Sequence, residues 1–280
     1  MSLLRVTRWA ALALMLALLA TNATAQAQAQ AEKQKYQPQV GQEGKDVVWV
    51  PTNEAVVQKM LDLAKVTASD FLIDLGSGDG RTVIAAAKRG ARALGIEYNP
   101  DMVALSKENA AAAKVGDRAQ FVKADLFETD FSQASVITMF LLPDINLKLR
   151  PKILDLKPGT RIASNSFTMG EWEADEEATI SEGCESWCTA LFWIVPAKVE
   201  GTWKLQGGEL TLTQQFQMIS GTLKSGAGST PITAGRMTGA QISFTVGDAI
   251  YTGRVKGATM QGTITTGATK TDWSAAKAVQ

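Results

Sequence analysis

The run of residues from Asp74 to Gly80 reads DLGSGDG and combines three glycines with two carboxylates. Glycine has no Cβ, so the backbone at such positions can adopt positive φ and approach a ligand closely. An apolar run at 71–73 precedes the loop, and a helical pattern over 81–90 follows it. A strand, a glycine turn and a helix in this order form the ligand crevice of open α/β sheets.

The glycine spacing separates two classes of ligand. The loop has the pattern G-x-G-x-G and lacks the G-x-G-x-x-G that suits a dinucleotide pyrophosphate. Carboxylates stand before the loop (Asp74), inside it (Asp79) and at the end of the next apolar run (Glu97). These acids suit a ligand with a cationic amino-acid part and a ribose diol, and they suit pyrophosphate poorly.

The elements that must position these acids follow a regular strand–helix alternation over 46–200. The predicted strands are 71–74, 93–97, 119–125, 135–142 and 160–166, and the predicted helices are 53–66, 81–90, 99–114 and 144–156. This alternation predicts a Rossmann-like, doubly wound parallel sheet. Pro51 and Thr52 precede the first helix as an ordinary turn and cap or as a loop that folds over the ligand.

Two further strands are predicted at 178–182 and 189–196, after the acidic segment 171–177, which we interpret as solvated surface. Cys184 and Cys188 lie between these strands. They form either a disulfide across a short bend or two free buried thiols.

The composition changes at residue 201. Residues 201–280 contain 13 glycines, 15 threonines and ten charged residues. Short alternating segments, such as 209–213 and 241–245, are separated by glycine-bearing turns. The pattern predicts an all-β accessory domain over 201–280, either an antiparallel β-sandwich or a small barrel.

The N-terminus has the features of a secretory signal peptide over 1–25. Arg5 and Arg8 precede an apolar stretch at 9–20, and Ala23 to Ala25 form an A-x-A cleavage site. The alternative is an uncleaved anchor. The signal peptide predicts export to the periplasm or cell envelope. We also predict a flexible leader over 26–45 and no membrane span in the mature chain.

Composition excludes several functions. The chain has 28 basic and 28 acidic residues and no histidine. The absence of histidine excludes histidine-based catalysis and nearly every zinc site, so we expect no metal. No basic stretch interleaved with aromatic residues is present, and we expect no nucleic-acid partner.

Four motifs together resemble class I S-adenosylmethionine-dependent methyltransferases. The loop 74–80 resembles their first motif, and 96–100, 123–127 and 140–143 resemble the motifs of the second, third and fourth strands. The sequence Val-Pro-Thr at 50–52, together with 142–143 and Ser166-Phe167 before Trp172, resembles small protein-lysine methyltransferases. These are related to the mitochondrial enzymes that methylate subunit c of ATP synthase and the adenine nucleotide carrier. The resemblance covers about 47–200.

The resemblance implies S-adenosylmethionine as cofactor and assigns roles around it. Asp74 and Asp79 would face the amino-acid end of the cofactor. Glu97 would accept hydrogen bonds from the ribose hydroxyls, and Asp125 would lie against the adenine amino group. The full implied set is Pro51, Thr52, Asp74, Gly76, Ser77, Gly78, Asp79, Gly80, Glu97, Tyr98, Asn99, Asp125, Leu126, Leu141, Leu142 and Pro143.

The implied activity is methyl transfer to an acceptor. The acceptor that the resemblance favours is the amine of a protein lysine, and the other candidate is a small molecule. No residue can be named as the general base. The strand-four motif lacks the Asn-Pro-Pro-Tyr of methyltransferases that act on nucleic acids or glutamine amides. The alternative function is that of an exported cell-envelope binding or structural protein that retains the fold without turnover.

Overall fold

A computed structural model describes residues 36–278 of the chain. The predicted signal peptide and residues 26–35 of the predicted leader lie outside these residues. Within the described range, no helix is long and apolar enough to cross a bilayer.

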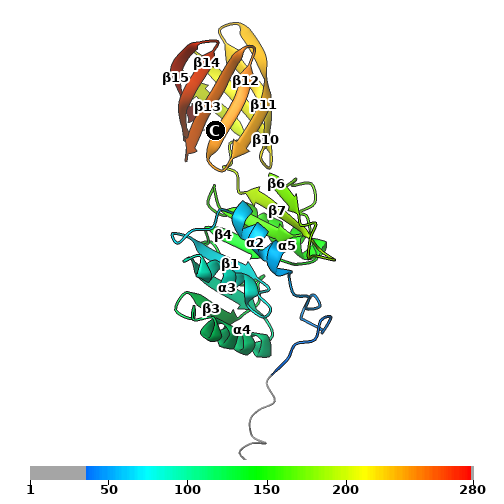
Figure 1. The fold of residues 1–280 in the computed structure, drawn as a ribbon. Helices are drawn as coiled ribbons and strands as arrows, with labels where there is room; N and C mark the ends of the chain where they lie inside the picture. Colours follow the sequence, from blue (N-terminus) through cyan, green and yellow to red (C-terminus); the bar gives the residue numbers. More distant parts are fainter. Residues whose placement is uncertain (1–35, 279–280) are drawn as a thin grey trace, which may run out of the picture. The chain divides into compact units, whose positions relative to one another are not determined.

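Seven strands form one sheet, in the order β3-β2-β1-β4-β5-β7-β6 (Figure 1). Strands β1 to β5 pair in parallel, and β7 pairs antiparallel with β5 and β6. The strands are β1 (Phe71–Leu75), β2 (Arg92–Glu97), β3 (Ala119–Lys123), β4 (Val136–Met139), β5 (Arg161–Asn165), β6 (Glu176–Thr179) and β7 (Thr189–Ile194). The predicted Rossmann-like class is confirmed.

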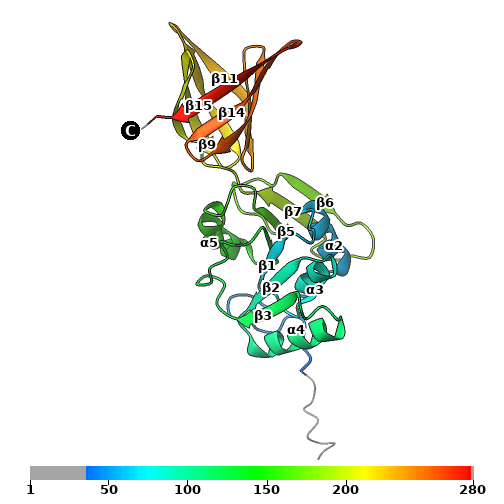
Figure 2. The same ribbon diagram turned by 90° about the vertical axis from the view of Figure 1, so that its left-hand side faces the viewer.

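Helices cover both faces of the sheet. They are α2 (Glu54–Leu63), α3 (Arg81–Lys88), α4 (Pro100–Ala112) and α5 (Pro143–Leu154). Buried side chains of α2 and α3 pack in one core, whereas Ile145, Leu149 and Ile153 of α5 pack in another core with Ile73 and Ile137. Figure 2 shows α5 on one side of the sheet and α2 and α3 on the other. Neighbouring residues of a strand point to opposite faces, so each central strand contributes to both cores.

Several predicted boundaries were wrong. Asn53 caps α2, because its side chain accepts a hydrogen bond from the backbone amide of Ala55; Thr52 does not. Strand β4 ends at Met139, because this residue forms the last pairs with Leu75 of β1 and Ser164 of β5. Strand β6 begins at Glu176, inside the segment predicted to be only solvated surface.

An ion pair between the buried Asp70, just before β1, and the partly exposed Arg161, at the start of β5, joins the amino ends of these strands. The Asp70 carboxylate accepts hydrogen bonds from the Arg161 guanidinium, from Ser135 Oγ at 2.8 Å and from the Thr67 amide at 2.8 Å. Burial opposes ionisation of Asp70, but these donors together lower its pKa. The pair fixes the end of the sheet opposite the carboxyl ends of the strands.

The region after residue 200 is a closed eight-stranded antiparallel barrel, with the order β10-β11-β12-β13-β14-β15-β8-β9 (Figure 1). Its strands are β8 (Gly201–Leu205), β9 (Gly208–Gln215), β10 (Met218–Ser225), β11 (Gly228–Thr238), β12 (Gln241–Val246), β13 (Ala249–Lys256), β14 (Thr259–Thr266) and β15 (Thr269–Lys277). Pairing of β15 with β8 closes the barrel, which decides between the sandwich and the barrel that the sequence left open. The core includes Trp203, Phe244, Tyr251 and Trp273.

Candidate functional site

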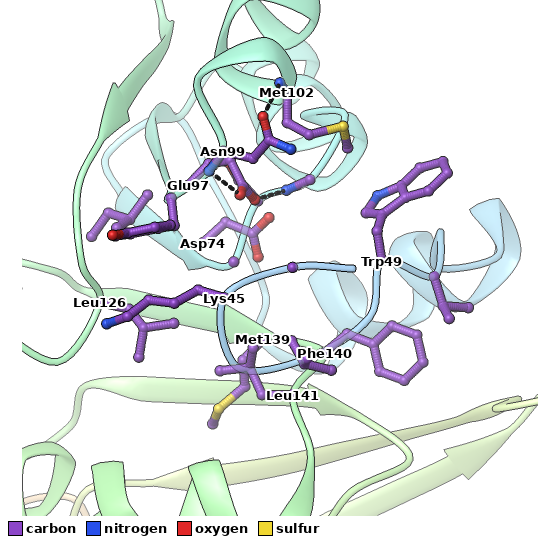
Figure 3. A pocket seen from close by; sticks show the side chains of 18 of the residues that line it. Lys45, Trp49, Asp74, Glu97, Asn99, Met102, Leu126, Met139, Phe140 and Leu141 are labelled. Carbon is purple, nitrogen blue, oxygen red and sulfur yellow. Dashed lines mark hydrogen bonds between the residues drawn. The ribbon is translucent and has the colours of Figure 1, made fainter. Parts of the chain in front are cut away.

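A cavity opens at the carboxyl ends of β1, β2 and β4. Its empty space is about 1040 Å³, including the part open to solvent. Strands β1 and β4 are neighbours at the point where the strand order reverses. Ligands of open α/β sheets bind at this switch point. Figure 3 shows Asp74 and Glu97 on one side of the cavity and Met139, Phe140 and Leu141 on the other.

The glycine loop needs its glycines for conformation and for packing. Gly76, Gly78 and Gly80 have φ values of +77°, +53° and +84°, which L side chains rarely adopt. A Cβ on Gly78 would lie 2.6 Å from the Trp49 indole nitrogen, and one on Gly80 would lie 2.7 Å from the Phe121 ring. The loop is therefore closely packed between the segment before α2 and the sheet.

Glu97 is held by two backbone amides. Its Oε2 accepts from Gly78 N at 2.9 Å, and its Oε1 accepts from Asn99 N at 2.8 Å (Figure 3). A carboxylate has about four acceptor sites, so both oxygens can still accept from hydroxyl groups. The carboxylate is thus oriented before any ligand binds, and it ties the glycine loop to the start of α4.

Asp74 is 5 % exposed and accepts a 2.6 Å hydrogen bond from Thr138 Oγ1. Burial raises the pKa of Asp74 to about 7; the Thr138 hydroxyl opposes this rise, and the charges of Glu97 and Asp79 add to it. A buried carboxylate without a cationic partner is costly. The site thus offers a position where a ligand cation would be stabilised.

Asp79 has a partner within the protein. Its carboxylate accepts from Arg81 Nη2 at 2.6 Å and from Arg81 Nε at 3.0 Å. The same guanidinium donates from Nη1 to the Thr52 carbonyl at 2.8 Å. Asp79 therefore fixes the segment at Thr52 to the glycine loop, a role that sequence reasoning did not assign.

Asp125 is paired with Lys45, a residue that the sequence did not indicate. The Lys45 ammonium donates to Asp125 and lies 5.0 Å from the centroid of the Tyr98 ring. The hydrogen bond from Lys45 is the main cause of the lowered pKa of Asp125. A ligand group that reaches Asp125 must share this carboxylate with the ammonium or compete with it.

Most of the residues expected to bind the cofactor line the cavity, including all four of the acids Asp74, Asp79, Glu97 and Asp125. Gly80, Leu142 and Pro143 do not line it. Gly80 caps α3 and contacts the sheet, whereas Leu142 and Pro143 turn the chain into α5. Residues that sequence reasoning missed include the segment 42–49, Met102, Met139 and Phe140.

The cavity fits S-adenosylmethionine by its chemistry. Carboxylates at the ends of β1 and β2, and just beyond the end of β3, provide acceptors for an ammonium, a ribose diol and an amino group. The Ser77 hydroxyl is buried and has no hydrogen-bond partner among the described residues. Ile96, Met102 and Leu126 provide apolar surface for a purine ring. In residues 36–278 no group of three or more acidic or cysteine side chains could hold a metal ion.

The part of the chain that forms the cavity is similar to known methyltransferases. A family model described as the ANTKMT methyltransferase domain matches residues 74–176. The protein-lysine N-methyltransferase of Saccharolobus islandicus is 43 % identical over 140 residues, which cover 49 % of this chain and 87 % of the relative. A lysine N-methyltransferase of Mus musculus, named for the C subunit of ATP synthase, is 40 % identical over 116 residues, 41 % of this chain and 46 % of the relative. This chain thus spans about half the length of the mouse relative.

A solved structure covers the same part of the fold. An RNA methyltransferase from Salinibacter ruber in complex with S-adenosyl-L-homocysteine is 46 % identical, with a TM-score of 0.50. The match covers 54 % of this chain and 96 % of that chain. The match to the family model ends at residue 176, so it does not extend to the barrel.

Proposed function

This chain belongs to the family of S-adenosylmethionine-dependent methyltransferases that includes the protein-lysine N-methyltransferases, and we propose from this premise that its acceptor is a lysine amine of a protein outside the cytosol. One observation carries the part of the proposal that concerns the cofactor. Asp74, Glu97 and Asp125 are brought together around a single cavity, although they are far apart in the sequence. A domain that had lost its cofactor would have no need for this set.

The roles of the acids follow from their surroundings. Asp74 is buried and has no cationic partner among residues 36–278, so it would pair with the cofactor ammonium. Glu97 is oriented by two amides and would accept the ribose hydroxyls. Asp125 would accept a hydrogen bond from the adenine amino group, in competition with Lys45. The predicted assignment of Asp79 to the ammonium is weaker, because Arg81 already neutralises this carboxylate.

S-adenosylmethionine supplies a methyl group that is already activated on a sulfonium centre. The task of the protein is then to align donor and acceptor and to exclude water. Met139 and Leu141, at the end of β4, provide the apolar surface for this. The lysine must lose its proton before attack, and a chain without histidine leaves water or a carboxylate to accept it.

Charge favours a protein acceptor over RNA. Residues 171–185, which surround β6, contain seven acidic residues and no lysine or arginine. Glu171 and Asp175 are paired with arginines from elsewhere in the chain, whereas the other five acids are exposed. These five exposed acids repel a phosphate backbone, whose binding depends on basic side chains. They attract a lysine-bearing segment. The family of this chain includes proteins named for both kinds of acceptor, and this charge distribution is the reason for our choice.

Two observations support an exported location. The N-terminal sequence has the features of a signal peptide, and Cys184 and Cys188 are joined by a disulfide. Disulfides persist in the periplasm and outside the cell and are rare in the cytosol. Fractionation of cells into cytosol, periplasm and envelope, followed by detection of the mature chain, tests the location. Recovery only from the cytosol would contradict it.

The activity is tested with the chain that begins after residue 25. Calorimetry measures S-adenosylmethionine binding, and methyl transfer is followed with labelled cofactor, an envelope protein extract and a total RNA sample. We expect tight binding and label on lysine, located by mass spectrometry. Glu97→Gln, which removes the charge and preserves the shape, should lose both.

Other outcomes of this experiment point to other functions. Tight binding with no transfer to protein or RNA would favour the alternative function of an envelope binding protein that retains the fold. Label on RNA alone would contradict the lysine assignment while leaving the methyltransferase activity in place.

A further inference from the structure

An aromatic cluster connects the cofactor cavity to the protein surface. The cluster consists of Phe140, Phe167 and Trp187. Phe140 lines the cavity beside Met139 and Leu141 (Figure 3). Its ring stacks on that of Phe167 at a centroid distance of 5.8 Å and meets the Trp187 indole edge-on at 5.9 Å. Trp187 is 46 % exposed, so the cluster reaches from the cavity to solvent.

Trp187 is held in an unfavourable backbone conformation. Its φ of +53° lies in the left-handed region, which bulky residues rarely occupy. The disulfide between Cys184 and Cys188 closes the turn on both sides of it. Asn53, the cap of α2, donates from Nδ2 to the Gly183 carbonyl at 2.7 Å and anchors the same turn. The disulfide and this hydrogen bond therefore hold a large, exposed aromatic residue in place, although it does not belong to a core.

Phe167 is also fixed. It follows Ser166, which has a φ of +58°. Its carbonyl accepts hydrogen bonds from Ser164 Oγ at 2.8 Å and from Asn146 Nδ2 at 3.2 Å. These bonds hold the turn after β5 against α5. The ring can thus remain stacked on Phe140 when a ligand enters.

We propose that this aromatic cluster is the entry channel for the acceptor lysine, with Trp187 as its outer binding residue. The inference rests on the proposed function and assigns residues to its substrate. The faces of aromatic rings attract ammonium groups, and their surfaces pack against the methylene stem of lysine. Glu182 and Glu185 are exposed in the same turn as Trp187. The acidic segment 171–185 continues this surface, so a basic protein segment is the occupant that the charges select.

The test compares Trp187→Ala, Trp187→Phe and the control Ile250→Ala. Ile250 is a similarly exposed apolar residue, 47 % exposed, on the barrel. Each variant is measured for cofactor binding by calorimetry and for methyl transfer to poly-L-lysine and to a set of basic lysine-containing peptides. We expect kcat/KM for the acceptor to fall about five- to thirty-fold in Trp187→Ala, the range of a cation–π contact, with unchanged cofactor affinity. Trp187→Phe should stay within about twofold of the original chain, because phenylalanine also offers an aromatic face.

The outcomes separate this inference from the function on which it rests. If the original chain methylates lysine and Trp187→Ala has the same acceptor kcat/KM as Ile250→Ala, the proposed entry channel is wrong, whereas the proposed lysine methylation stands. If the original chain binds cofactor but methylates no lysine, both are wrong. A Cys184→Ser, Cys188→Ser double variant tests the positioning by the disulfide. It should lower kcat/KM for the acceptor at unchanged cofactor affinity, and an acceptor kcat/KM equal to that of the original chain would overturn this part.

Discussion

Cofactor affinity should depend steeply on pH because of Asp74. Burial raises the pKa of this carboxyl to about 7 in the free protein, and a cofactor ammonium would bind its ionised form. The ionised fraction is about 0.03 at pH 5.5 and 0.5 at pH 7.0. Affinity should therefore rise about fifteen-fold over this interval, since an α-amino group, with a pKa of about 7.7–8.0, stays mostly protonated up to pH 7.0.

Calorimetry between pH 5.5 and 7.0 measures this dependence, and repeating it in buffers of different ionisation enthalpy counts the proton released on binding. The Asp74→Asn variant should bind weakly at every pH. The Thr138→Val variant removes the 2.6 Å hydrogen bond that favours the carboxylate, so its affinity curve should move to higher pH. A pH-independent affinity in the original chain would refute the assignment of Asp74 to the ammonium.

The same ionisation affects folding, with a sign opposite to the common case. The folded-state pKa lies above the ordinary value of 3.8, so the folded state holds its proton longer than the unfolded chain. The contribution of Asp74 to the stability of the folded state is most favourable below about pH 4, and it is lost as the pH rises to about 7. A shift of about three units corresponds to about 4 kcal/mol as an upper bound. Asp74→Asn should therefore raise the free energy of unfolding at pH 8, measured in denaturant, while it abolishes tight cofactor binding.

Three further predictions concern the surroundings of the site. Lys45→Met frees Asp125 and should tighten cofactor binding about two- to fivefold, because an exposed ion pair of modest strength no longer competes; an unchanged dissociation constant would contradict this. Gly78→Ala places a Cβ 2.6 Å from the Trp49 indole at a φ that alanine disfavours, and it should lower stability by about 1–3 kcal/mol and weaken binding; a wild-type melting temperature would show that the loop adjusts. Asp70→Asn removes the counter-charge of Arg161, whose side chain is 23 % exposed, and it should cost about 1–3 kcal/mol in denaturant unfolding with little effect on cofactor affinity.

The sequence predicted those features that depend on neighbouring residues. The glycine loop and the acids at the strand ends are local patterns, and the strand–helix alternation predicts a doubly wound parallel sheet because parallel strands need crossover connections. The contact between Lys45 and Asp125 joins residues 80 positions apart. No periodicity signals such a contact, because it depends on how the segment before α2 folds back across the sheet. Trp49 was missed for the same reason, whereas Phe140 lies in the motif 140–143 and only its place in the cavity was missed.

The barrel shows the same limit in a different way. Alternation with period two predicts strands and identifies their inward faces, but it does not say whether the first strand pairs with the last. Residues as distant as Trp203 and Lys277 are partners in the closing ladder. The sequence therefore predicted two architectures equally well, and only the paired edges decide between them.

The closing ladder has a consequence for how the chain acquires its structure. The sheet is complete when β7 has formed at Ile194, so this part can fold while the rest of the chain is still being synthesised. The barrel cannot close until β15 has emerged, because β8 has no other partner on that side. Contacts that span such a sequence distance form slowly. For that interval β8 exposes an unpaired strand edge, and the barrel is the part of this protein that most needs protection from aggregation.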